Sequence, residues 1–230
     1  MIYRHLFLAV ALAPSALGLA PITDDNIHAA VRSWCANSTT AAATYGPIGD
    51  WDTSNVRNMS YLFYGDHTIP GKYVPGAENF NDDISRWDTA NVESMLSTFN
   101  FAASFDVNIS PWNVGRVTTM DHMFAYASVF NQPVGSWDVS SVLDFWGMFG
   151  PAPRFNQNLN SWQVGRAQLM TNMFFEASAF DQQLCWDISS NCNTREMLYY
   201  TAGACVDYSC CPGCGTATHL NPSGNFPPEC

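Results

Sequence analysis

The chain has 230 residues, of which 47% are hydrophobic and 14% aromatic, so it holds enough apolar material for one packed domain. Charged residues make up only 13% of it, and the formal net charge is −11. This acidic balance argues against sequence-independent binding to nucleic acid and against docking on an anionic membrane.

Residues 1–18 have the features of a secretory signal peptide. Arg4 gives a short basic start, residues 6–13 form a compact apolar run, and small residues precede a cleavage site after Gly18. The apolar run is too short to span a bilayer, no later stretch is long enough, and the C-terminus lacks the tail of a GPI signal. The sequence therefore predicts a mature protein that is secreted or held at the extracellular surface, without a transmembrane segment.

Residues 19–47 are predicted to form an N-terminal cap. An amphipathic helix is expected over residues 23–35, with Thr23 or Asp24 as its N-cap. Its apolar face consists of Ile27, Ala30, Val31, Trp34 and Cys35. This helix would cover the open end of the repeats that follow.

Residues 48–197 contain an internal repeat. Six tryptophans, separated by 36, 25, 25, 25 and 24 residues, mark its units: Trp51, Trp87, Trp112, Trp137, Trp162 and Trp186. A near-constant step of this size is typical of stacked supersecondary units that share one core. The first step is longer because of residues 66–76, a Pro- and Gly-rich insertion that is either a binding loop or a tolerated surface loop.

Each unit is predicted to fold as a strand followed by a helix. Apolar residues flank the tryptophan with the alternation of a short strand. Further along, Val117, Met120, Phe124 and Ala127 have the i, i+3, i+7, i+10 spacing of one helical face. The predicted fold class is therefore α/β, a solenoid with a parallel β-sheet and one strand plus one helix per 25-residue repeat.

The repeat resembles that of a known family. The run Phe130-Asn131-Gln132, followed by residues 137–142 (WDVSSV) and by Met148-Phe149, is similar to the 25-residue repeat of BspA-like leucine-rich-repeat surface proteins, long catalogued as a mycoplasma domain of unknown function. Residues 43–52 are also similar to the segment that leads into the first repeat of such proteins. The likeness covers residues 23–200. It implies a leucine-rich-repeat-like solenoid in a secreted or surface protein that binds or adheres, and it offers no catalytic residues.

A polar side chain directly follows each repeat tryptophan: Asp52, Asp88, Asn113, Asp138, Gln163 and Asp187. Carboxylates stacked in this way can bind a cation or a sugar. Asp88 and Asp138, roughly 10 Å apart on a parallel sheet, would lie near the separation found in inverting glycosidases. Hydrogen bonds to the turn backbone explain the same residues without any ligand.

A second polar column follows a repeated phenylalanine and is predicted to satisfy turn backbone groups: Asn81, Asp106, Asn131, Asn156 and Asp181. The predicted binding face consists of the exposed sheet positions beside the repeat tryptophans, because concave solenoid surfaces usually engage partners. Its candidate residues are Arg86, Asp88, Asn113, Ser136, Asp138, Ser161 and Gln163.

An even number of cysteines in an exported chain predicts disulfides, here concentrated in a Cys-rich tail over residues 198–230. The candidates are Cys35, Cys185, Cys192, Cys205, Cys210, Cys211, Cys214 and Cys230. The first pairing to consider is Cys185 with Cys192. A zinc site and a redox pair, Cys211 with Cys214, are the alternatives. Three triplets predict N-glycosylation, at Asn37, Asn58 and Asn108.

Taken together, these features predict a secreted or cell-surface repeat protein that is not an enzyme and that binds an extracellular protein or glycan. No cofactor, metal or nucleic acid is expected, since the histidines are scattered and no phosphate loop or nucleophile elbow occurs. Two rival functions remain. One is a carbohydrate-active enzyme on a parallel β-solenoid that uses the aspartate column, and the other is a structural wall or matrix component.

Overall fold

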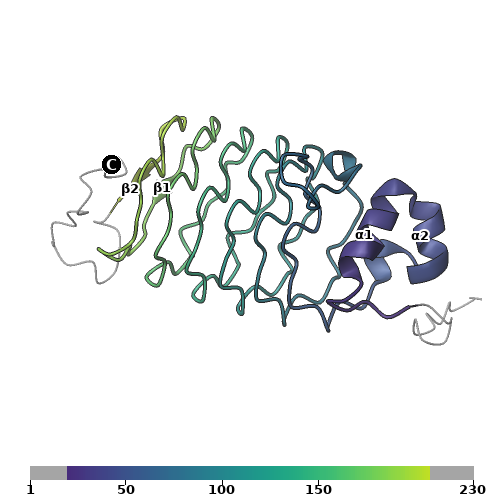
Figure 1. Cartoon of the computed structure of the whole chain (residues 1–230). Coiled ribbons are helices and arrows are strands. Elements are labelled where there is room, and N and C mark those ends of the chain that lie inside the picture. The colour runs from purple at the N-terminus through teal and green to yellow at the C-terminus, as the bar shows by residue number, and fades with distance from the viewer. Residues whose placement is uncertain (1–19, 208–230) are drawn as a thin grey trace, which may run out of the picture.

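A computed structural model describes residues 20–207, and its repeats stack as coils along one long axis (Figure 1). At one end lie helices α1 (Ile27–Ala36) and α2 (Ser38–Tyr45). At the other end strand β1 (Gln183–Leu184) pairs in parallel with β2 (Cys205–Val206). Two single helical turns, η2 (Ile48–Asp50) and η3 (Ala77–Asn79), complete the regular structure of these residues. Each coil is named by its repeat tryptophan, for example the Trp112 coil.

The prediction of one strand and one helix per repeat is wrong. Residues 51–207 form no α-helix, and neighbouring coils share a single parallel bridge position instead of a continuous strand. The bridge residues all lie seven positions after a repeat tryptophan: Asn58, Ser94, Thr119, Asp144, Leu169 and Asn193. The chain is therefore a stack of turns held by main-chain bonds, and the α/β leucine-rich-repeat-like assignment does not describe it.

Overlapping reverse turns replace the predicted helix. In the Trp112 coil, the N–H of Met123 donates to the oxygen of Met120 at 3.1 Å, and that of Ala125 donates to His122 at 3.2 Å. His122 and Tyr126 have left-handed backbone, with φ of 51° and 59°. Because a right-handed helix cannot continue through such residues, the segment becomes a chain of turns. The apolar spacing of one residue in every three or four suits both structures, which is why it predicted a helix.

Left-handed residues recur at equivalent positions in the coils, ten and fourteen residues after the tryptophan. Those with a side chain are Tyr61, Ser97, Phe101, His122, Tyr126, Asn172, Glu176, Glu196 and Tyr200. This geometry turns alternate N–H groups toward the next coil. In the Trp112 coil, Met120, His122 and Phe124 donate to the oxygens of residues 144, 146 and 148 at 2.9, 2.7 and 2.8 Å. The bonds fix each coil in register with the next.

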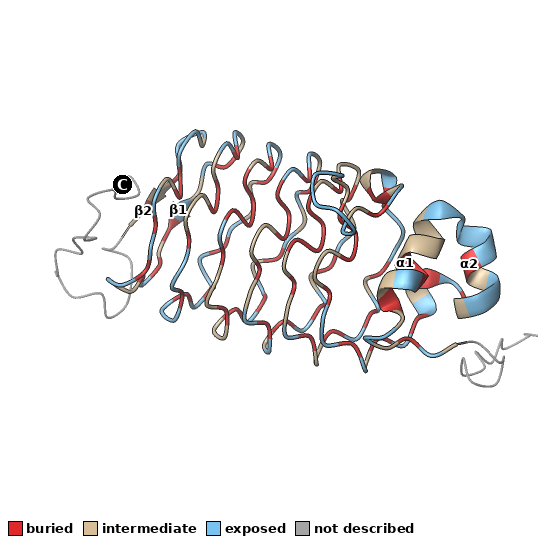
Figure 2. Cartoon of the chain, in the orientation of Figure 1, coloured by how far each residue is buried: buried red, intermediate tan, exposed pale blue. Residues whose placement is uncertain are grey.

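Stacked aromatic rings fill the interior, where buried residues line the inner side of every coil (Figure 2). The ring centroids of Trp87 and Trp112 lie 6.3 Å apart, and their planes differ by only 2°. The rings of Phe99 and Phe124 stack at 5.6 Å in the same manner. Burial of each such side chain contributes about 1.5–3 kcal/mol, so a single coil cannot be stable without its neighbours.

The predicted N-terminal helix is confirmed as α1, which buries Ile27, Ala30 and Val31 against the first coil. Its predicted N-cap is wrong, because Asn26 precedes the helix and makes no side-chain cap bond. Asp24 instead accepts the N–H groups of residues 57 and 58, at 2.8 and 3.0 Å. These two bonds close the exposed edge of the first coil.

The predicted Cys185–Cys192 bridge is wrong, because Cys192 is a free thiol, as is Cys35. Cys192 is buried in the last coil, where its N–H donates to Ser189 as Val142 donates to Val139 in an earlier coil. It is thus a core side chain. Cys185 and Cys205 each take part in a disulfide bond. The remaining tail cysteines (Cys210, Cys211, Cys214, Cys230) and the signal segment 1–18 lie outside the described residues. No helix within residues 20–207 is long and apolar enough to cross a membrane.

Candidate functional site

The seven residues of the predicted binding face are all exposed, but they lie in turns and irregular segments beside the buried tryptophans and not on a sheet. Several have local partners. Asp88 accepts the N–H of Ala90 at 3.0 Å, and Asp138 accepts that of Ser140 at 3.1 Å. Asn113 accepts the N–H of Gly115 at 3.1 Å. These bonds support the interpretation in which the residues stabilise turns.

Further contacts of Asp138, Arg86 and Ser161 also indicate a structural role. Hydrogen bonds from the Ser140 hydroxyl and N–H lower the pKa of Asp138. Arg86 forms an ion pair with Asp50 at 2.5 Å, and the Ser161 hydroxyl donates to the carbonyl of Gly135. Ser136 and Gln163, the remaining members, are exposed.

The second polar column satisfies backbone groups, as the sequence predicted. The amide oxygen of Asn81 accepts the N–H of Asp106 at 2.8 Å, and the carboxylate of Asp106 accepts that of Asn131 at 2.9 Å. Asn131 and Asn156 continue the series toward Asp181, at 2.9 and 3.1 Å. The column is a ladder that ties one coil to the next, and the amide oxygens of its asparagines accept these main-chain bonds.

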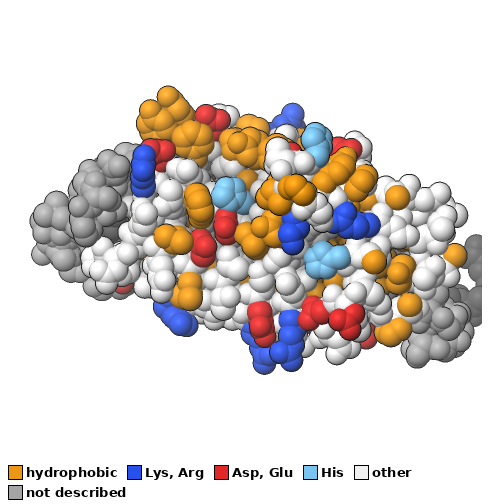
Figure 3. Space-filling view, viewed as in Figure 1, with side chains coloured by type: hydrophobic (Ala, Val, Ile, Leu, Met, Phe, Trp, Pro, Cys, Tyr) orange, Lys and Arg blue, Asp and Glu red, His pale blue; other side chains and the backbone are white. Residues whose placement is uncertain are grey.

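A different surface carries exposed aromatic side chains. We call it the turn face and define it as the outward side chains seven to fourteen residues after each repeat tryptophan. Figure 3 shows hydrophobic side chains spread over one face of the stack, with histidine and acidic side chains among them. Five of its large hydrophobic residues are exposed: Tyr126, Trp146, Leu169, Tyr199 and Tyr200. Several large apolar side chains exposed on one face are typical of an interaction surface.

At the centre of the turn face lies a group that we call the Trp146 cluster: Asp121, His122, Asp144 and Trp146. The indole of Trp146 is 44% exposed, and the His122 ring meets it edge-on at 5.4 Å. His122 Nδ1 contacts the Asp121 carboxylate, while Asp144 accepts the N–H of Trp146 at 2.9 Å. The cluster therefore combines an open aromatic surface with two carboxylates on adjacent coils.

The groups around Asp144 shift the pKa of its carboxyl. Burial raises the pKa of Asp144, which is half-buried, and the nearby charge of Asp121 raises it further. The N–H of Trp146 and the His122 ring act in the opposite direction. A ligand hydroxyl that donated to Asp144 would favour its charged form. The carboxyl is thus better suited to accept hydrogen bonds than to meet another anion.

A glycine makes room for this arrangement. Gly147 has a φ of +57°, and a Cβ there would lie 2.8 Å from His122 Nε2. Equivalent positions in neighbouring coils carry side chains, so the missing one leaves space for the imidazole beside Trp146. Sequence reasoning overlooked the cluster because it placed these residues on a helix. One signal was present: Trp146 is a tryptophan outside the repeat register.

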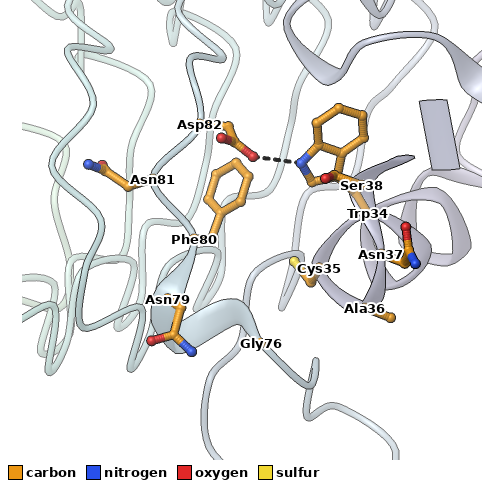
Figure 4. Close-up of a pocket in the computed structure, with 10 residues that line it drawn as sticks. All are labelled: Trp34, Cys35, Ala36, Asn37, Ser38, Gly76, Asn79, Phe80, Asn81 and Asp82. Atoms are coloured by element: carbon orange, nitrogen blue, oxygen red, sulfur yellow. Dashed lines mark hydrogen bonds between the residues drawn. The ribbon is translucent and has the colours of Figure 1, made fainter. Parts of the chain in front are cut away.

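A polar cavity of about 360 Å³ lies between the N-terminal cap and the first coils (Figure 4). Trp34 Nε1 donates to Asp82 across it at 2.7 Å, and Asn37, which caps α2, lies at its edge. Burial, with help from Asp82 and Glu78, raises the pKa of the Cys35 thiol to about 12. The thiol is therefore protonated at neutral pH and is not a nucleophile. These contacts join the cap to the stack.

The other predicted features fall on the surface. The glycosylation candidates Asn37, Asn58 and Asn108 have exposed side chains. Asn58 and Asn108 accept the N–H groups of Ser60 and Ser110, at 2.9 and 3.0 Å. Over residues 20–207, His, Cys, Asp and Glu side chains form no group of three or more that could hold a metal ion.

The stacked coils and their regular register define a repeat protein with an aromatic outer face. Residues 33–145 and 108–209 match the family described as "Mycoplasma protein of unknown function, DUF285". Because the two matches together span more than half of the chain, the protein belongs to this family. No curated protein and no solved structure matches the chain.

Proposed function

We propose that this is a secreted or cell-surface protein that binds an extracellular polysaccharide through its turn face and is not an enzyme. The observation that carries the proposal is the exposed indole of Trp146 beside the carboxylates of Asp121 and Asp144. The signal-peptide features of residues 1–18 support export. The finer resemblance to BspA-like surface proteins supports a role in adhesion.

A polysaccharide fits the chemistry of the Trp146 cluster. Sugar rings present apolar C–H faces that pack on aromatic side chains, and hydroxyls that donate to carboxylates. Tyr126, stacked on Phe101 at 4.1 Å, adds a second aromatic platform on the coil that holds Asp121 and His122. Because the coils are rigid and evenly spaced, such platforms are suited to a chain of repeating units. A protein partner would use the same aromatic residues but would not require the carboxylates.

The main rival is a glycoside hydrolase, and two observations bear on it. The predicted helices would have counted against a β-solenoid enzyme, but the coils contain no α-helix, so this objection no longer applies. However, a general acid needs a raised pKa, and the pKa of Asp138 in the aspartate column is lowered. Asp144 has a raised pKa and is the one better suited to that role. We favour binding because the N–H of Trp146 donates to Asp144 and favours its charged form, which accepts hydrogen bonds, over the protonated form that a general acid needs.

The test is affinity electrophoresis of the exported protein in gels that contain hydroxyethyl cellulose, mannan or a soluble β-1,3-glucan. We expect retardation by at least one neutral polymer. Trp146→Ala should weaken that binding about tenfold or more, and Tyr126→Ala several-fold, since each removes about 1–2 kcal/mol of aromatic contact. Far-UV circular dichroism should remain that of the unchanged protein.

A matched control separates the two faces. The double variant Asp88→Ala, Asp138→Ala alters the turns beside the buried tryptophans and leaves the turn face intact. If this double variant loses binding while Trp146→Ala keeps it, our assignment of the face is wrong. Release of new reducing ends from a polymer, abolished by Asp144→Asn, would establish the hydrolase instead. Retention by none of the polymers, with self-association in gel filtration, would favour the structural wall component.

A further inference from the structure

A groove of about 410 Å³ runs along the edge of the turn face. It is shared by several coils, and its lining includes the side chains of Glu93, Arg116, Thr118, Ser141, Leu143 and Arg166. Leu143 is directly followed in the chain by Asp144 of the Trp146 cluster. The groove therefore borders the surface that we propose binds polysaccharide.

The two arginines of this groove lack acidic partners. Arg116 donates to the neutral amide of Asn91 at 3.1 Å. The ion pairs within residues 20–207 involve other side chains, so neither Arg116 nor Arg166 has a carboxylate within 4.0 Å. Glu93, which also lines the groove, pairs with Arg57 at 3.6 Å. Beside this paired glutamate, the groove thus carries two arginines that have no carboxylate partner among residues 20–207, on a chain whose formal net charge is −11.

Guanidinium groups determine which ligand chemistry fits. Each presents donors in a planar fork and no acceptor, a geometry that matches the oxygens of a carboxylate or sulfate. The two arginines lie on the Trp112 and Trp162 coils, with Ser141 on the coil between them. Arg116 is bonded to Asn91 of the Trp87 coil, so an acidic substituent can meet one arginine at either end of the groove. A neutral sugar hydroxyl accepts only single, weaker hydrogen bonds from these groups, and a cation is repelled.

We propose that the groove between Arg116 and Arg166 binds an acidic substituent, a sulfate ester or a uronate carboxylate, of the polysaccharide that lies on the Trp146 cluster. This rests on the proposed function and adds the class of ligand. The acidic carboxyls of the cluster face the hydroxylated ring, while the anionic substituent projects to the groove. The preferred ligand is then a sparsely acidic polysaccharide, since dense charge would be repelled by the rest of the chain.

Three polymers with one backbone test the proposal: hydroxyethyl cellulose, carboxymethyl cellulose and cellulose sulfate, each of low substitution. At low salt, we expect the unchanged protein to bind an acidic polymer about tenfold more tightly than the neutral one. The double variant Arg116→Gln, Arg166→Gln should lose this preference, at about threefold per arginine, and still bind the neutral polymer. Arg154→Gln, an exposed arginine outside the groove, is the matched control and should keep the preference.

Salt gives an independent readout, because screening weakens the acidic component and leaves the aromatic one. The preference for the acidic polymer should fall between 50 and 200 mM salt, a range of about twofold in Debye length. A preference that survives both the double variant and high salt would overturn the proposal, as would stronger binding of the neutral polymer. If Trp146→Ala still binds the neutral polymer as tightly as the unchanged protein does, the proposed function is wrong. The arginine variants then test by themselves whether the groove binds an acidic group. Which acidic polymer is preferred identifies the substituent.

Discussion

Each buried repeat tryptophan contributes both packing and a directed hydrogen bond. The indole of Trp112 stacks on Trp87 at 6.3 Å, and its Nε1–H donates to the carbonyl oxygen of Ile84 at 3.1 Å. The same bond recurs in the other coils, always to the residue three positions before the preceding tryptophan or, in the first coil, to Gly46. The tryptophan is therefore required for more than its volume.

Replacing Trp112 by Phe should lower the free energy of unfolding by about 2–4 kcal/mol, because it leaves a cavity and a buried carbonyl without its donor. Trp146→Phe is the matched control and should change stability by less than about 0.5 kcal/mol, since that ring is on the surface. Urea unfolding followed by circular dichroism measures both. Equal effects of the two changes would contradict the assignment of Trp112 to the core.

Two aspartates on neighbouring surfaces have pKa shifts of opposite sign, and this gives a pH test. The pKa of Asp144 is raised, so its stabilising contribution is complete below 3.8, its ordinary value, and is lost as pH rises through the folded pKa. Asp144→Asn should therefore be more stable than the unchanged protein at pH 7. That advantage should disappear in acid.

Asp138 should behave in the opposite way. Because its pKa is lowered by Ser140, its contribution is present above 3.8 and is lost as pH falls through the folded pKa. Asp138→Asn should be less stable than the unchanged protein at pH 7, and the two should converge in acid. Unfolding free energies from pH 2.5 to 8 test both variants. If Asp144→Asn and Asp138→Asn change the unfolding free energy at pH 7 in the same direction, one of the two pKa shifts is wrongly assigned.

At the scale of the element, the left-handed residues decide between a helix and a chain of turns. Glu176 is exposed, has a φ of 57°, and donates its N–H to Tyr199 at 2.9 Å. Glu176→Gly should raise the unfolding free energy by up to about 1 kcal/mol, while Glu176→Val should lower it by about 1–2 kcal/mol. In a helix the order would reverse, because glycine is the poorer helix former. Chemical denaturation of the two variants gives the answer.

The features that depend on burial could be predicted from the sequence, namely the shared core and the apolar face of α1. The helix predicted in each repeat was wrong because backbone conformation decides that segment. The tryptophan step indicated a shared core, and the apolar face of α1 is where the pattern placed it. By contrast, Met120 and Phe124, four residues apart in the sequence, face the core in these turns just as they would in a helix. No side-chain pattern announces that His122 and Tyr126 adopt positive φ, since both are ordinary L-residues.

The candidate site was missed for the same reason. The predicted helix gave no reason for Asp121 and Trp146 to lie close together. Their proximity follows from the main-chain bond of residue 122 to residue 146 in the next coil. The residues predicted instead, such as Asp88 and Asp138, repeat strongly because every coil needs its turn stabilised. The polar residues that repeat in every coil therefore have a structural role. The candidate site contains Trp146, a tryptophan that lies outside the repeat register.

At the scale of the whole molecule, the coils interact mainly with their neighbours, so the stack should tolerate removal of one complete unit. Deletion of residues 137–161 removes 25 residues and joins Ser136 to Trp162 in register. We expect a cooperative, less stable protein, since one coil interface is lost. Deletion of residues 137–148 breaks the register and should leave an unfolded chain. Circular dichroism and urea unfolding distinguish these outcomes, and folding of both deletions would contradict the fixed register.

Hydrogen–deuterium exchange on the protein, with and without a saturating polysaccharide from the binding screen, locates the binding face. We expect slowed exchange in residues 121–126 and 144–147, which form the Trp146 cluster and its neighbouring platform, and unchanged exchange around residues 88–90 and 138–140. Protection centred on those two turns, with the Trp146 cluster unaffected, would contradict this assignment of the face.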